Sequence, residues 1–167
     1  MSWKTYIDEN KDRFVQELIK FISIPSVSAS DDHFQDVVKA GDWVVSRLSA
    51  AGLKNAKMMT TETHPVVYAD WLEAGSEKPT ILIYGHFDVQ PADPIDMWDN
   101  DPFQPIIKDH RIYGRGASDD KGNMLAPILA IEAFLRSEGT LPVNIKFFFE
   151  GQEEIGSPTL AKFVREN

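Results

Sequence analysis

The chain has 167 residues, 43% of them hydrophobic, which is enough for one globular domain with its own core. Its formal net charge of −9 argues against a nucleic-acid partner, because binding to phosphate backbones needs clustered lysine and arginine. The chain has no cysteine, which excludes disulfides, thiolate nucleophiles and Cys-ligated zinc. Any bound metal must therefore be held by imidazole and carboxylate groups.

The N-terminal segment MSWKTYIDENKDR is charged and lacks the apolar centre of a signal peptide. No apolar run approaches the roughly 18 residues that a membrane helix needs. We therefore expect a cytoplasmic protein with no membrane partner.

Two helices are predicted first. Apolar residues recur at helical spacing between Trp3 and Ile22, which predicts an amphipathic helix that ends before Pro25, in the loop 23–30. A second helix is predicted from about Asp32 to a stop at Gly52.

Strands are predicted next, at 56–61 and 66–72, and then in the segment TILIYGHFDV. Within that segment, the run Ile81–Tyr84 is short, apolar and rich in β-branched residues. Such a run is typical of a central strand that is covered on both faces.

The remaining chain alternates irregular and regular segments. Four prolines between Gln90 and Pro105 indicate a long loop, and 106–108 with 112–113 are expected to form a small hairpin. A helix over Lys121–Ser137 and an apolar strand over Asn144–Glu150 follow. Ser157 and Pro158 look like the N-cap and first residue of a last helix.

The alternation of helices and strands predicts an α/β fold, a three-layer α/β/α sandwich around a mixed, mostly parallel sheet. In open α/β sheets, functional residues gather in the loops that follow the strands. Three such loops here are rich in residues that bind metals.

The first loop contains His86 and Asp88, directly after the Ile81–Tyr84 strand. Strand periodicity places their side chains on one face, and a carboxylate beside a ligand imidazole fixes its tautomer and raises its basicity. The alternative is a histidine that only caps a strand.

The second loop, YGRGASDDKG, has glycines that permit tight turns, followed by Asp119 and Asp120. Adjacent aspartates at a helix start are also explained by N-capping and pairing with the helix dipole. The Walker spacing of a phosphate loop is not met.

The third loop contains Glu153 and Glu154, directly after the second apolar strand. One glutamate can bind a metal while its neighbour acts as a base toward metal-bound water. The alternative is a solvated acidic turn. The other histidines, His33, His64 and His110, are interpreted as ordinary surface residues.

The strings GHFDVQP, GRGASDDKG and EGQEEIGS, in this order and spacing, resemble the aminoacylase/carnosinase-type co-catalytic zinc peptidases. The resemblance covers nearly the whole chain. The DVQP continuation and the run Trp98–Phe103 are most similar to the dipeptidase branch. The resemblance implies hydrolysis of dipeptides or short peptides at a two-zinc site, with Mn²⁺ or Co²⁺ as possible alternative metals.

The resemblance also implies a role for each site residue. His86 would bind one zinc, with Asp88 orienting it, and Asp119 would bridge both ions. Glu153 would be the general base, and Glu154 would bind the second zinc. The Asp119–Asp120 peptide is often cis in this family.

Family members are over twice this length and add a further carboxylate ligand, a final histidine ligand and an inserted lid domain through which they often dimerise. None of these has a counterpart here. We therefore expect residues 1–167 to be the N-terminal portion of a di-zinc peptidase catalytic domain, incomplete and inactive alone. Rival interpretations are an N-acyl amino-acid deacylase of the same family and a metal-free binding module that retains the scaffold.

Overall fold

A computed structural model describes all residues, 1–167. The helices and strands follow one another in the predicted order. Their bounds are α1 Trp3–Ile22, α2 Phe34–Ala51, β1 Lys54–Met59, β2 Val66–Trp71, β3 Thr80–His86, β4 Ile106–Lys108, β5 Arg111–Tyr113, α3 Lys121–Glu138, β6 Asn144–Glu150 and α4 Leu160–Glu166.

The helix ends follow ordinary capping chemistry. The Ser2 hydroxyl accepts a hydrogen bond from the Thr5 amide at 3.2 Å and caps α1. Helix α2 ends at Gly52, whose φ of 99° is a conformation that favours glycine. The prediction that Ser157 caps the last helix was wrong, because α4 begins three residues later, at Leu160.

The main sheet has the strand order β1-β2-β6-β3. Only β3 and β6 are parallel, while β1–β2 and β2–β6 are antiparallel. The α/β class with a mixed sheet is confirmed, but the expected majority of parallel pairs was wrong. The reason is the connections: residues 60–65 join β1 to β2 as a hairpin, and only β3 reaches its neighbour through a crossover helix, α3.

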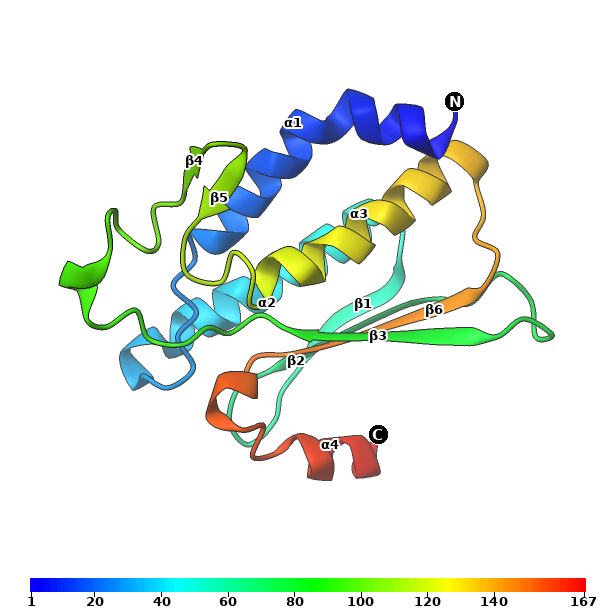
Figure 1. Cartoon of the computed structure of the whole chain (residues 1–167). Coiled ribbons are helices and arrows are strands. Elements are labelled where there is room, and N and C mark those ends of the chain that lie inside the picture. Colours follow the sequence, from blue (N-terminus) through cyan, green and yellow to red (C-terminus); the bar gives the residue numbers. More distant parts are fainter.

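Helices cover one face of this sheet (Figure 1). Helices α2 and α3 pack on the strands, and α1 packs on α3. The opposite face carries only the short α4 near the C-terminus, so these residues form two of the three expected layers and a small part of the third. The core between helices and sheet includes Val37, Val44, Leu48, Ile128, Phe147 and Phe149.

Strand β3 differs from its prediction. It was expected to be central and covered on both faces, but it is an edge strand paired only with β6. Ile81, Leu82 and Tyr84 are 48%, 62% and 52% exposed. An apolar sequence makes a strand suited to burial, yet burial itself depends on neighbours that residues 1–167 do not supply.

The predicted hairpin is confirmed as β4 and β5, and the preceding proline-containing segment is irregular, with one short 3₁₀ turn. None of the helices combines the length and apolar character that a bilayer span requires.

Candidate metal centre

Two of the three predicted loops meet because β3 and β6 are parallel neighbours. Their carboxyl ends lie at the same sheet edge, where His86 pairs with Glu150. The Phe87 amide continues this pairing by donating to the Glu150 carbonyl at 2.8 Å. The loop after His86 and the loop after Glu150 therefore leave the sheet side by side.

The predicted metal-binding side chains converge at this edge. His86 Nε2 lies 3.0 Å from Asp119 Oδ1 and 3.8 Å from Glu153 Oε2. One ligand atom each from His86, Glu153 and Glu154 lies within 4.8 Å of the others. All five predicted site residues, Asp88 included, thus belong to one cluster.

The two adjacent aspartates face different surroundings. The Asp119 side chain is 76% exposed, whereas Asp120 Oδ2 accepts the His86 amide at 3.3 Å. The peptide between them is cis. A Cβ atom at Gly85 would lie 2.7 Å from Asp120 Oδ2, so the close approach of this loop to β3 requires glycine at that position.

Asp88 is the fully buried member of the cluster. Its Oδ1 accepts the Glu153 amide at 3.2 Å, and its Oδ2 accepts the Glu154 amide at 3.0 Å. Oδ1 is also 3.4 Å from His86 Nδ1, and the same nitrogen lies 3.2 Å from the Asp88 carbonyl oxygen, its hydrogen-bond partner. One carboxylate therefore contacts both strand-end loops.

The protonation of His86 reflects these neighbours. Burial alone would lower its pKa, but the hydrogen bond and charge of Asp88, with the charges of Asp120 and Glu153, raise the pKa to about 9. In the metal-free protein at neutral pH, His86 is therefore a cation among carboxylates.

A second buried carboxyl, Glu150, lies at the start of the third loop. Its Oε1 accepts hydrogen bonds from the Tyr84 hydroxyl and from Ser157 Oγ, the latter at 3.0 Å. Burial raises the pKa of Glu150 despite these two donors. Through Ser157, its side chain is hydrogen-bonded to the third loop, and it is not one of the predicted ligands.

Lys121, which follows the two aspartates, is completely buried. Its ammonium donates to the carbonyls of Phe21, at 3.0 Å, and Ile24, at 2.6 Å. Burial lowers the pKa of Lys121 to about 7. The Lys121 side chain therefore connects the start of α3 to the last turn of α1 and to the segment that follows it.

Several contributing residues escaped the sequence analysis. Gln90 Nε2 donates to Glu154 Oε2 at 2.9 Å and to its carbonyl at 3.0 Å, a contact that the DVQP string alone did not reveal. His64 was interpreted as a surface residue, which was wrong: it is buried, and its Nε2 lies 3.0 Å from the Ser28 carbonyl oxygen. No periodic pattern marks such contacts, because they join loops far apart in sequence.

The donor set suits a divalent cation with mixed nitrogen and oxygen ligands. One imidazole and several carboxylates are typical ligands of zinc, and manganese or cobalt accept the same groups. The remaining histidines, His33, His64 and His110, lie outside the cluster. The side chains grouped closely enough to hold one ion are those of His86, Glu153 and Glu154, and Asp119 contacts this group through His86.

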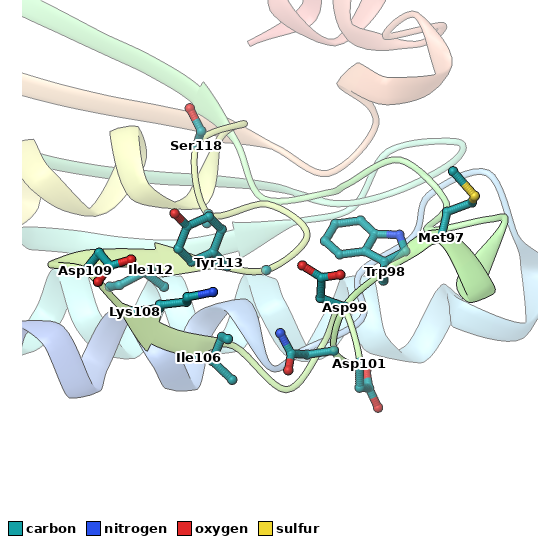
Figure 2. Close-up of a pocket in the computed structure, with 13 residues that line it drawn as sticks. Met97, Trp98, Asp99, Asp101, Ile106, Lys108, Asp109, Ile112, Tyr113 and Ser118 are labelled. Carbon is teal, nitrogen blue, oxygen red and sulfur yellow. The ribbon is translucent and has the colours of Figure 1, made fainter.

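A cavity of about 790 Å³ adjoins this centre and is lined by none of the predicted ligands. Figure 2 shows Tyr113 and Lys108 of the β4–β5 hairpin on one side and Trp98 and Asp99 of the irregular loop on the other. Ser118, next to Asp119, also lines the cavity. The Arg115 guanidinium lies 5.3 Å from the centre of the Trp98 ring, so the glycine-containing loop after β5 contacts the irregular loop before β4.

Comparison with known proteins identifies related sequences. A family model described as peptidase family M20/M25/M40 matches residues 82–167. The chain is 41% identical to the Cys-Gly metallodipeptidase dug1 of Schizosaccharomyces pombe, over 95% of this chain and 35% of that protein. It is 38% identical to the human Beta-Ala-His dipeptidase, over 96% of this chain and 34% of that protein.

Solved structures agree with these matches. The dipeptidase Dug1p of Saccharomyces cerevisiae superposes with a TM-score of 0.88 at 33% identity, covering 99% of this chain and 38% of that one. Human carnosine dipeptidase 1 superposes with a TM-score of 0.85 at 37% identity, covering 97% and 36%. The chain therefore spans about a third of the length of the relatives it matches.

Proposed function

The chain belongs to peptidase family M20/M25/M40, and on that premise we propose that residues 1–167 are the N-terminal portion of the catalytic domain of a metal-dependent dipeptidase. The observation that carries this proposal is the convergence of His86, Asp119, Glu153 and Glu154 at one sheet edge. Relatives named as dipeptidases favour a dipeptide substrate over an N-acyl amino acid.

We assign the metal ligands from the donor set. His86, Glu154 and the exposed Asp119 would together hold two zinc ions. When bound, such a pair of cations polarises the scissile carbonyl and makes a water molecule more acidic. Manganese or cobalt is compatible with the same ligands.

Glu153 is assigned as the general base. Its side chain is 43% exposed, and its Oε2 lies 3.8 Å from His86 Nε2, so the carboxylate is at the cluster and also open to solvent. It would accept the proton of the attacking water and deliver it to the amine nitrogen that leaves. The hydrogen bond from its amide to Asp88 holds its main chain in place.

Asp88 is assigned as the residue that orients His86. Oδ1 lies 3.4 Å from His86 Nδ1, on the side of the ring opposite the Nε2 atom that faces Asp119 and Glu153. A carboxylate at Nδ1 leaves Nε2 as the ligand atom and makes the imidazole a better donor to a metal.

The test is Glu153→Gln in the full-length protein, assayed with Cys-Gly and β-Ala-His as substrates. Loss of the base should lower kcat by roughly 10²- to 10⁴-fold while metal content, measured by elemental analysis, is retained. Asp119→Asn should instead lower metal content at both sites. Glu9→Gln, an exposed change on α1, is the control and should leave both quantities unaltered.

Three outcomes would redirect the proposal. Full activity in Glu153→Gln would remove its role as base, and preference for N-acyl amino acids in the same assay would indicate a deacylase. Activity that tolerates alanine at His86, Asp119 and Glu154 together would favour a binding module. Cytoplasmic location and dimerisation of the full-length protein remain predictions.

A further inference from the structure

The loop between α1 and α2 lies directly beside the metal centre. The Val89 amide donates to the Ser26 carbonyl at 2.9 Å, and Val27 forms a parallel bridge with Val89. Ser26 Oγ donates to the Phe87 carbonyl at 2.6 Å. The loop thus follows residues 87–89 as a short additional strand would, and Ser26, Val27 and Ser28 are buried.

At the end of this pairing, Ser28 Oγ donates to Asp88 Oδ2 at 2.5 Å. Asp88 is fully buried, so its charge is stabilised by neighbouring donors rather than by water. The other two donors are the amides of Glu153 and Glu154. Ser28 supplies the only side-chain hydroxyl among these three hydrogen bonds, and such bonds to a charged acceptor are the strong ones.

Ser28 is itself held from behind. Its carbonyl oxygen lies 3.0 Å from His64 Nε2, and because a carbonyl only accepts, this nitrogen carries the proton. The buried His64 ring packs at 5.4 Å from the Phe34 ring at the start of α2. The main chain at Ser28 therefore has little freedom to move away from Asp88.

We propose that Ser28 is a positioning residue of the metal centre: its hydroxyl fixes the Asp88 carboxylate, which in turn holds the main chain of Glu153 and Glu154 and orients His86. This inference rests on the proposed function for its consequence in metal binding. The hydrogen-bond network itself belongs to residues 1–167 and can be tested without metal.

The first experiment compares Ser28→Thr with Ser28→Val in the metal-free 167-residue chain by amide NMR. The two side chains have the same shape and differ in the hydroxyl group alone. In the valine variant, the Glu153 and Glu154 amide protons should shift upfield and exchange with solvent roughly tenfold faster than in the threonine variant. Identical shifts and exchange rates in the two variants would overturn the proposal.

If the added methyl group unfolds both variants, Ser28→Ala against Ser26→Ala decides the question. Both serines are buried and donate through their hydroxyl groups, but Ser26 contacts a carbonyl and not the Asp88 carboxylate. Only Ser28→Ala should change the Glu153 and Glu154 amides. Equal changes in the two alanine variants would indicate a general effect on the loop and contradict a specific role for Ser28.

The second experiment measures zinc affinity of the full-length protein by calorimetry. Ser28→Val should weaken zinc binding by roughly 10- to 100-fold relative to Ser28→Thr, the range seen when outer partners of metal ligands are removed. Unequal NMR results with equal zinc affinities would overturn the positioning role while leaving the hydrogen bonds intact. A full-length protein that hydrolyses no dipeptide would contradict the proposed function and leave the NMR comparison unaffected.

Discussion

Asp88 and His86 form an electrostatic pair in which one partner is completely buried. Burial disfavours both charges separately, yet the Asp88 carboxylate and the nearby Asp120 and Glu153 favour the imidazolium. A raised folded-state pKa means that the metal-free protein binds this proton more tightly than an unfolded chain does. A metal ion bound at His86 would have to displace that proton at every pH below about 9, so its apparent affinity should rise with pH up to that value.

We predict that Asp88→Asn lowers the pKa of His86 from about 9 toward its ordinary value of about 6.5. Asparagine keeps the size and an acceptor oxygen but removes the charge that stabilises the imidazolium. The measurement is an NMR titration of the histidine ring protons in the metal-free chain.

The control for this titration is Asp8→Asn, an equivalent change on the exposed side of α1, which should leave the His86 midpoint in place. A wild-type His86 that titrates near 6.5, or an Asp88→Asn variant whose midpoint stays near 9, would contradict the electrostatic explanation.

At the scale of elements, four charged side chains join the three long helices. Arg13 and Glu17 of α1 meet Arg47 of α2 and Glu132 of α3, with Arg13 Nη2 2.7 Å from Glu132 Oε1 and Arg47 Nε 2.8 Å from Glu17 Oε2. Arg47 and Glu132 also form a direct ion pair, and their side chains are 6% and 5% exposed. The Tyr6 hydroxyl adds a hydrogen bond to Glu132 at 2.7 Å.

We predict that Glu132→Gln lowers the free energy of unfolding by about 3 kcal/mol, because it leaves the buried Arg47 guanidinium short of a counter-charge. Urea denaturation of the 167-residue chain measures this. Glu73→Gln, which breaks the exposed pair with Lys54, should cost about 0–1 kcal/mol. Equal losses of unfolding free energy in the two variants would show that the ion pairs between the helices contribute no more than an exposed pair does.

For the whole molecule, the sheet is open on the side of β3. An apolar groove of about 260 Å³ lies beside β3 and α3. Its lining residues include Ile81 and Ile83 of β3, Ile131 and Phe134 of α3, and Leu141 of the following loop. Exposed apolar strand edges are unusual in stable monomers, because they invite further pairing. The chain with this open edge spans about a third of the length of the relatives it matches.

We predict that the 167-residue chain alone binds zinc weakly and hydrolyses no dipeptide. Each zinc would have two protein ligands, counting Asp119 twice, whereas catalytic zinc ordinarily has three and a water molecule. Calorimetric titration with zinc at neutral pH is the measurement, with the His86→Ala variant as the baseline. Two tight equivalents of zinc, or measurable turnover, would contradict the prediction.

Local sequence patterns predicted most of the helices and strands and named the candidate residues of the site. Capping residues and 3.6-residue periodicity located α1 and α2, and alternation of helices with apolar strands predicted the α/β class. The candidate site residues His86, Asp119, Glu153 and Glu154 could be named because they all follow strands or start helices, and the resemblance to the zinc peptidases implied the role of each. Local patterns of this kind depend on neighbours in the chain, which the sequence contains.

Tertiary structure alone decided which residues lie side by side. The antiparallel pairing of β2 with β6, the edge position of β3 and the burial of His64 depend on contacts between distant segments. The same holds for the hydrogen bond of Ser28 to Asp88, residues 60 positions apart. Such contacts follow from how the whole chain packs and leave no periodic trace, so the residues that surround the candidate metal ligands became visible only in the folded molecule.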